Sequence, residues 1–204
     1  MHELTTADET RLRKLRGNVP VNAVLHVWLK AVHPHAPAEL RLALNDQVFG
    51  NVYVQNSEEY EFRMFFVPHG GELECAYDPE TTTISVAYWF TDAKVLEEGI
   101  TVLRTHAANA PAPAPGSYHF RPPFGWMNDP NGFGRFNGSA HLFYQHYSHG
   151  LKWNTMHWGH AVSEDFLHWR HLPIFLFPSE ELTAKPDKRG GAFSGSAIPL
   201  ENSA

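Results

Sequence analysis

Cysteine is almost absent from this chain, since Cys75 is the single one among 204 residues. One thiol excludes an internal disulfide and leaves no cysteine framework for zinc. A lone cysteine of this kind is typical of a small, buried apolar side chain.

Long runs of like charge and long apolar runs are also missing. The formal net charge is −6, and the clearest basic run is the short RLRKLR at residues 11–16. This composition gives little support to a nucleic-acid partner or an anionic membrane surface. No stretch approaches the roughly 18 consecutive apolar residues of a membrane span, and the first residues lack the apolar core of a secretion signal. We therefore expect a cytoplasmic protein without a membrane partner, and the sequence leaves its oligomeric state open.

Short β-rich runs fill most of the first hundred residues. They are separated by turn signals such as Asn45-Asp46, and several alternate apolar and polar residues. Many short strands with turns between them predict a β-sandwich. The runs are 21–29, 39–44, 48–54, 59–67, 72–77, 83–90 and 100–104.

Two further predictions concern polar positions of this first part. Thr6 to Glu9 fits a capping box, and Leu12 and Leu15 fit the inward face of a short N-terminal helix that would carry the basic run. Three acidic side chains are interpreted as solvated carboxylates: Glu72, Glu74 and Asp78.

A proline- and alanine-rich stretch, AANAPAPAPGS at 107–117, has the composition of a semi-rigid spacer. It predicts an N-terminal β-sandwich over 1–106 and a second module over 118–204. In the second module, Asn137-Gly138 stands between two aromatic-rich runs, which is a strong hairpin signal. Runs at 156–163 and 167–173 bring the number of strands to four, as in one blade of a β-propeller.

The stretch WMNDPNG at 126–132 places an acidic residue inside a tight sequence of turn formers. Asp-Pro-Asn-Gly fits a β-turn at all four positions, so we predict a turn at 129–132. Such a turn is ordinary by itself, and so is the Phe-Ser-Gly-Ser of FSGSA at 193–197.

Several motifs taken together are informative. WMNDPNG, LFYQ at 142–145, Trp153, HWGHAVS at 157–163 and FSGSA resemble glycoside hydrolase family 32 in their order and spacing. That family contains invertases, inulinases, levanases and sucrose-6-phosphate hydrolases. The resemblance implies an all-β fold, in which the N-terminal β-sandwich is followed by the first blade and the start of the second blade of a five-bladed β-propeller.

The resemblance also implies a mechanism and a site. Retaining glycosidases attack the anomeric carbon with one carboxylate, while a second carboxylic acid protonates the leaving oxygen. The family pattern assigns the nucleophile to Asp129, and the predicted turn would aim this side chain. Amide groups both donate and accept hydrogen bonds, which suits sugar hydroxyls. The implied substrate contacts are Trp126, Asn128, Gln145, Trp153, Phe193 and Ser194, with Asp187 as a further candidate at the rim.

No metal or organic cofactor is implied. The histidine pairs His157/His160 and His168/His171 are three residues apart, so on strands their side chains point to opposite faces and cannot share one ion. Trp158 and Trp169 are interpreted as packing residues of the blade.

The expected activity is release of fructose from sucrose or a short fructo-oligosaccharide, as a β-fructofuranosidase of the invertase type. Fructan hydrolysis by a levanase or inulinase and fructosyl transfer remain open, and a non-catalytic carbohydrate-binding protein is the alternative from another class. The family's Arg-Asp-Pro motif does not occur in this sequence, and its Glu-Cys motif does not occur in the second module. We therefore expect the transition-state-stabilising aspartate and the acid/base glutamate to lie beyond residue 204, and the 204-residue chain alone to be inactive.

Overall fold

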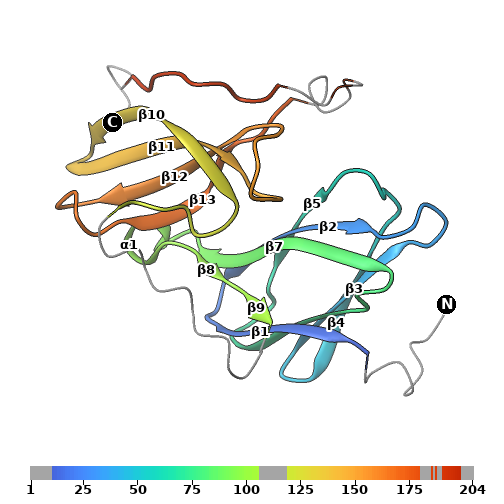
Figure 1. The fold of residues 1–204 in the computed structure, drawn as a ribbon. Coiled ribbons are helices and arrows are strands. Elements are labelled where there is room, and N and C mark those ends of the chain that lie inside the picture. The colour runs from blue at the N-terminus through green and yellow to red at the C-terminus, as the bar shows by residue number, and fades with distance from the viewer. Residues whose placement is uncertain (1–10, 106–118, 180–184, 186, 188–189, 199–204) are drawn as a thin grey trace. The chain divides into compact units, whose positions relative to one another are not determined.

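In the part of the chain that the structure describes, the protein is all-β apart from the four-residue helix α1 (Val95–Glu98) (Figure 1). The computed structural model describes residues 11–105, 119–179, 185, 187 and 190–198. The chain divides into two compact units, Met1–Asp92 with Thr101–Ala112, and Ala93–Ile100 with Pro113–Ala204. This division differs from the predicted modules at Ala93–Ile100, which belong to the second unit. The predicted spacer at 107–117 lies outside the described residues.

Two antiparallel sheets form the first unit. One has the strand order β4-β3-β6-β1-β9 and the other β5-β2-β7-β8. Both sheets contribute alternate side chains to one apolar core, with Leu15, Leu40 and Leu73 from the first sheet and Leu25 and Leu29 from the second. Two packed sheets are what the strand pattern predicted. The strands are β1 (Arg13–Val19), β2 (Ala23–Ala31), β3 (Ala38–Leu44), β4 (Gln47–Val54), β5 (Glu61–Phe66), β6 (Gly71–Tyr77), β7 (Thr82–Thr91), β8 (Thr101–Val102) and β9 (Arg104–Thr105).

The predicted N-terminal helix is wrong over its basic run, because Arg13–Val19 forms strand β1. The Leu12 to Leu15 spacing suits a helix, but from Leu15 onward the inward positions recur every second residue. Leu15 and Val19 are buried, and Gly17 between them faces Leu103. That period is the period of a strand. The predicted capping box at 6–9 lies outside the described residues.

Glu74 also differs from its prediction as a solvated carboxylate. It lies on β6 beside β1, where the Lys14 ammonium is 3.2 Å from its Oε1 and the Arg16 Nε donates to its Oε2 at 2.9 Å. Partial burial acts to raise the pKa of Glu74, but the hydrogen bonds from Arg16 and Lys14 outweigh it and lower the pKa. The basic run is therefore paired with an acidic strand.

A single antiparallel sheet of four strands forms most of the second unit, in the order β10-β11-β12-β13. Its strands are β10 (Trp126–Phe136), β11 (Ser139–Tyr147), β12 (His157–Ser163) and β13 (Arg170–Leu176). The predicted hairpin at Asn137-Gly138 is confirmed, with φ of 48° and 87° at these two residues. Positive φ at both central positions is what a two-residue hairpin turn of the I′ type requires.

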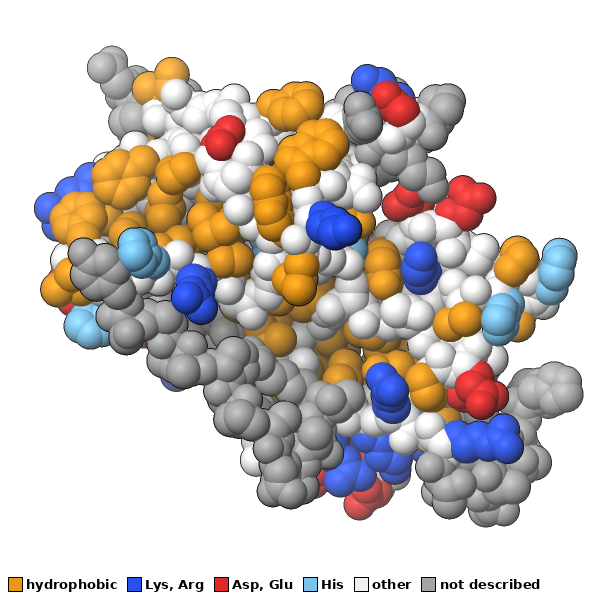
Figure 2. All heavy atoms as spheres, viewed as in Figure 1, with side chains coloured by type: hydrophobic (Ala, Val, Ile, Leu, Met, Phe, Trp, Pro, Cys, Tyr) orange, Lys and Arg blue, Asp and Glu red, His pale blue; other side chains and the backbone are white. Residues whose placement is uncertain are grey.

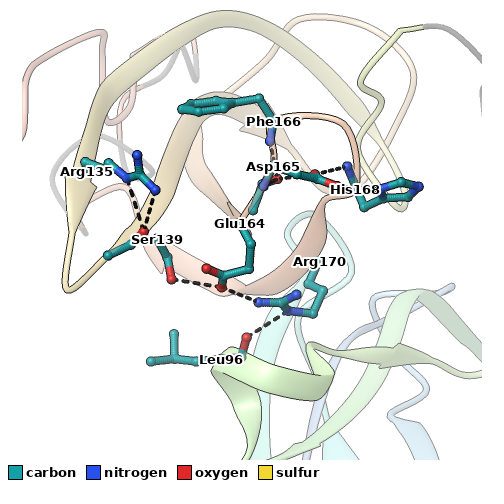
Figure 3. Close-up of polar contacts among 10 residues, drawn as sticks. Leu96, Arg135, Ser139, Glu164, Asp165, Phe166, His168 and Arg170 are labelled. Atoms are coloured by element: carbon teal, nitrogen blue, oxygen red, sulfur yellow. Dashed lines mark hydrogen bonds and ion pairs between the residues drawn. The ribbon is translucent and has the colours of Figure 1, made fainter.

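The segment Ala93–Ile100, which includes helix α1 (Val95–Glu98), packs beside edge strand β13 (Figure 3). The Ile100 N–H donates to the carbonyl of His171 at 2.9 Å, and the Arg170 Nε donates to the carbonyl of Leu96 at 2.8 Å. Arg170 also donates to Glu164 at 3.1 Å, and Glu164 accepts from Ser139 at 2.9 Å. Arg170 and Glu164 thus join this segment to Ser139 at the start of β11 and to the end of β12.

Hydrophobic side chains gather on the surface over the β10 to β13 sheet (Figure 2). No helix among the described residues is long and apolar enough to cross a membrane. The exposed large side chains of this unit include Phe133, Phe166, Leu167, Phe175, Phe177 and Phe193.

Candidate active site

Strand β10 carries two irregularities where the sequence predicted a tight turn. Met127 pairs with His146 and Pro130 with Tyr144, so β10 holds one residue more than β11 in this interval. The same happens between Asn131, which pairs with Phe143, and Gly134, which pairs with His141. The turn prediction for 129–132 is therefore wrong: these residues form a bulged strand, in which Gly132 adopts a φ of 47°.

The first bulge decides where the carboxylate of Asp129 points. A bulge bends its strand and turns a side chain away from the regular alternation. Asn128 and Asp129 are the residues between the paired positions, and Asp129 is exposed. The sequence of turn formers thus places an acidic side chain at the surface of the sheet without ending the strand.

Both oxygens of the Asp129 carboxylate accept hydrogen bonds. The Asn128 Nδ2 donates to Oδ1 at 3.0 Å, and the Ser194 hydroxyl donates to Oδ2 at 2.7 Å. Gln145, on β11, donates from its Nε2 to the same Ser194 oxygen at 2.9 Å. A chain of hydrogen bonds therefore runs from a buried amide through an exposed hydroxyl to the carboxylate, which holds the plane of the carboxylate.

A buried amide supports the backbone beneath this group. Asn131 is 3% exposed. In the amide orientation that satisfies both of its polar atoms, the Asn131 Nδ2 donates to the carbonyl of Asp129 at 3.2 Å. In the same orientation, the Asn131 Oδ1 accepts a hydrogen bond from the backbone N–H of Gln145 at 3.2 Å. Asn131 thereby ties the main chain at Asp129 to the main chain at Gln145.

The segment that carries Ser194 has no regular secondary structure and is held by hydrogen bonds to two strands. The Gly132 N–H donates to the carbonyl of Gly195 at 3.1 Å, and the Ala192 N–H donates to the carbonyl of Met156 at 2.9 Å. The indole Nε1 of Trp158 donates to the carbonyls of Ala192 and Phe193, both at 3.0 Å.

The residues predicted for the site are placed in different ways. Asp129, Asn128, Ser194 and Gln145 come together in one hydrogen-bonded group. Trp126 begins β10, and its carbonyl accepts a hydrogen bond from the His146 Nδ1 at 3.0 Å.

Three further predicted contacts lie on exposed segments. Phe193 precedes Ser194 and is 58% exposed, and Trp153 is 42% exposed on the loop between β11 and β12. Asp187 stands in an exposed turn. The structure therefore joins a carboxylate, a hydroxyl and two amides by hydrogen bonds, and Phe193 is the sequence neighbour of Ser194 in this group.

Two buried histidines of the same sheet, His146 on β11 and His157 on β12, are held neutral by burial. Burial lowers the pKa of His146 to about 3 and that of His157 to about 4. His157 contacts His149 and Phe177, whereas His160 contacts His141, so the paired histidines of β12 face different neighbours. Among the described residues, no three histidine, cysteine, aspartate or glutamate side chains come together as metal ligands.

Residues 119–204, which contain this site, match the family model described as the glycosyl hydrolases family 32 N-terminal domain. Residues 119–204 are thus similar to proteins of glycosyl hydrolase family 32, and we call them the family 32 unit. The family 32 unit is 50% identical over 85 residues to a levanase of Bacillus subtilis strain 168, covering 42% of this chain and 11% of that protein. It is 51% identical over 81 residues to a sucrose-6-phosphate hydrolase of Escherichia coli, covering 40% of this chain and 16% of that protein.

A solved structure extends the likeness beyond the family 32 unit. The glycoside hydrolase family 32 protein from Bifidobacterium adolescentis matches with a TM-score of 0.78 at 28% identity, covering 93% of this chain and 32% of that chain. The match includes the first unit, so its all-β fold also occurs in a family 32 protein. The chain thus spans only a small part of the length of the curated relatives it matches.

Two residues of the family 32 unit that sequence analysis did not connect with the site lie beneath it. Asn131 was assigned only to a turn, and Trp158 only to packing of the sheet. Trp158 donates to two carbonyls of another segment, and Asn131 joins the carbonyl of Asp129 on its own strand to the backbone N–H of Gln145 on β11. The available signal was their position inside the motifs WMNDPNG and HWGHAVS, which are far apart in the sequence.

Proposed function

We propose that the family 32 unit supplies the nucleophile of a retaining hydrolase acting on fructosides, and that Asp129 is this nucleophile. The observation that carries the proposal is the hydrogen-bonded chain from Gln145 through Ser194 to the Asp129 Oδ2, which joins residues up to 65 positions apart. A carboxylate that is exposed yet fixed in its plane has the line of approach that attack on carbon requires.

In this proposal the reaction has two steps. A carboxylate oxygen of Asp129 attacks the anomeric carbon of the fructosyl group, and the bond to the leaving oxygen breaks while a second carboxylic acid supplies a proton. The fructosyl ester on Asp129 is then hydrolysed by water, which restores the carboxylate. Each carboxylate oxygen keeps a further lone pair beside the hydrogen bond it accepts, so Asn128 and Ser194 do not block the attack.

The residues around Asp129 provide contacts suited to a sugar ring. Asn128 and Gln145 present amide groups, and Ser194 presents a hydroxyl, each able to exchange hydrogen bonds with fructose hydroxyls. We assign Trp126, Trp153 and Phe193 to apolar walls, because aromatic rings cover the less polar faces of sugars. In the same proposal the β10 to β13 sheet is the first blade of a five-bladed propeller.

For the substrate we propose sucrose or a short fructo-oligosaccharide. The relatives named above are a levanase and a sucrose-6-phosphate hydrolase, and both names refer to a fructoside as the substrate. The polar groups described here would contact the fructosyl part, which these compounds have in common.

The test is Asp129→Asn in the intact protein, with fructose release from sucrose as the measurement. The amide keeps the size of the side chain but is a poor nucleophile, so we expect kcat to fall by several orders of magnitude while sucrose still binds. Asp46→Asn, the same change in an exposed turn of the first unit, should leave turnover unchanged. NMR of the first product should show fructose with its anomeric configuration retained. Near-normal turnover of Asp129→Asn, or an inverted product, would contradict the assignment.

A further inference from the structure

The segment Gly190–Gly195 must be held in place for Ser194 to reach Asp129, and part of this support comes from hydrogen bonds between backbone groups. The Met156 N–H donates to the carbonyl of Gly190 at 3.1 Å, and the Ala192 N–H donates back to the carbonyl of Met156. These bonds fix the beginning of the segment. They leave the two peptide groups just before Ser194 to another partner.

That partner is the side chain of Trp158. Its Nε1 lies 3.0 Å from the carbonyl oxygen of Ala192 and 3.0 Å from that of Phe193. The Phe193 carbonyl belongs to the planar peptide group that includes the Ser194 nitrogen and ends at the Ser194 Cα, so its direction fixes the plane in which these two atoms lie. A single N–H shared between two acceptors thus orients the backbone immediately ahead of the hydroxyl.

The indole ring also supports the segment after Ser194. A Cβ atom added to Gly195 would lie 3.2 Å from the Cη2 and Cζ2 atoms of Trp158, so the ring lies directly under this glycine. Trp158 is only 6% exposed and pairs with Gln145 across strands β11 and β12. The paired residues Gln145 and Trp158 therefore provide the amide that donates to the Ser194 hydroxyl and the indole that holds the Ser194 backbone.

We propose that Trp158 is a positioning residue for the nucleophile, acting through the 190–195 segment on Ser194 and through Ser194 on Asp129. This inference rests on the proposed function for its effect on hydrolysis. A packing role alone requires a large apolar side chain, whereas the positioning role requires the indole N–H. Phenylalanine supplies the first and lacks the second, which separates the two roles.

The first measurement is amide hydrogen exchange of the intact protein, followed in the peptide that covers 190–197. Trp158→Phe should speed exchange in this peptide, because its two carbonyl contacts are lost. Trp169→Phe is the matched control, since the Trp169 Nε1 also donates to a carbonyl, that of Phe166 at 3.1 Å, outside the Asp129 group. Unchanged exchange at 190–197 in Trp158→Phe would overturn the proposal.

The second measurement is a double-mutant cycle on fructose release from sucrose. Trp158→Phe should lower kcat/KM roughly tenfold, mainly through kcat, because the nucleophile is less well oriented. In a Ser194→Ala background the same change should alter kcat/KM by no more than about twofold, because the residue it acts through is gone. Additive losses would show that Trp158 does not act through Ser194.

A third variant covers the case in which Trp158→Phe does not fold. Gly195→Ala leaves the indole intact and places a methyl group against it, which should move the segment and reproduce both effects. Normal exchange and normal turnover in Gly195→Ala would contradict the proposal. If the unaltered protein releases no fructose from any fructoside, the proposed function fails, while the exchange measurement still decides whether Trp158 holds the segment.

Discussion

At the scale of residues, Asp129 is fixed both at its side chain and at its backbone. Asn128 and Ser194 each donate to one carboxylate oxygen, and Asn131 bonds the carbonyl of the same residue. The bulge makes this combination possible, since it lets the Asp129 side chain reach the surface while Asn131, two residues later, is buried. A regular strand would place both side chains on one face.

Asn131→Ala tests the backbone part of this arrangement. The substitution removes the partner of the Asp129 carbonyl and of the Gln145 N–H, and leaving buried polar groups unsatisfied costs about 1–3 kcal/mol. We expect the free energy of unfolding, measured with urea, to fall by this amount. Asn51→Ala, at an exposed position of β4, should change it by less than about 0.5 kcal/mol. Equal losses in the two variants would show that Asn131 makes no special contribution.

The site was predictable only in part from the sequence. Asp129, Gln145 and Ser194 were predicted through the motifs that contain them, and in the structure Gln145 donates to Ser194 and Ser194 donates to Asp129. Trp158 and Asn131 were not predicted, because their partners are main-chain groups, and these include groups far away in the sequence: Ala192 is 34 positions from Trp158, and Gln145 lies on another strand than Asn131. Residue type gives no information about which distant carbonyl an N–H will meet.

At the scale of elements, the strands were largely predictable and the irregular geometry was not. Alternating apolar residues and the Asn137-Gly138 turn gave most of the β-strands of both units. Asp-Pro-Asn-Gly was predicted to be a turn because all four residues favour one locally. Instead, Pro130 and Asn131 pair with residues of β11, which keeps this stretch in the sheet. The turn-forming residues produce bulges in the strand and do not end it. Tertiary pairing thus overrides the local preference.

The segment Ala93–Ile100 covers part of the free edge of β13. Edge strands expose unpaired backbone groups, and proteins commonly cover them. Here the carbonyl of His171 is bonded by the Ile100 N–H, and Gly99 passes so close that an added Cβ atom would lie 2.6 Å from this oxygen. No pattern in the sequence predicted this contact, since the segment stands between β7 and β8 of the first unit.

Gly99→Ala should therefore destabilise the protein more than an ordinary glycine substitution. Gly99 has a φ of 72°, and the methyl group would meet the His171 carbonyl. Gly138→Ala is the matched control, because Gly138 has a φ of 87° but nothing within 4 Å of an added Cβ atom. We expect about 1 kcal/mol for the control from backbone strain and a clearly larger loss for Gly99→Ala, measured by urea unfolding. Equal losses of unfolding free energy in the two variants would show that the 93–100 segment moves away from β13 at little cost.

At the scale of the whole molecule, buried neutral histidines link stability to pH. In each case burial is the main cause of the lowered pKa, and the folded protein keeps the ring uncharged. Most of these rings belong to the second unit, where aromatic neighbours surround them. The pKa values are about 4 for His26, His157 and His171 and about 3 for His146 and His160.

A histidine whose pKa is lower in the folded state than in the unfolded state destabilises the protein in acid. Well above pH 6.5 the ring is neutral in both states and contributes no pH dependence. As the pH falls below 6.5, the unfolded chain binds a proton that the folded protein does not bind, so the free energy of unfolding falls until the pH reaches the folded pKa. Between pH 6.5 and 4.5 the carboxylates of an unfolded chain are mostly ionised, so the effect of the histidines dominates there.

We therefore predict that unfolding between pH 6.5 and 4.5 takes up protons, and that His157 accounts for about one of them. Each such histidine should lower the free energy of unfolding by about 1 kcal/mol per pH unit across this range. The measurement is urea unfolding of the intact protein at several pH values, followed by tryptophan fluorescence. His157→Gln, which is neutral at every pH, should have a shallower slope of stability against pH. His35→Gln, at an exposed position of the first unit, should keep the slope of the unaltered protein. The same slope in His157→Gln and in the unaltered protein would contradict the prediction. It would mean that His157 takes up its proton in the folded protein as readily as in the unfolded chain, so that it adds no pH dependence to the free energy of unfolding.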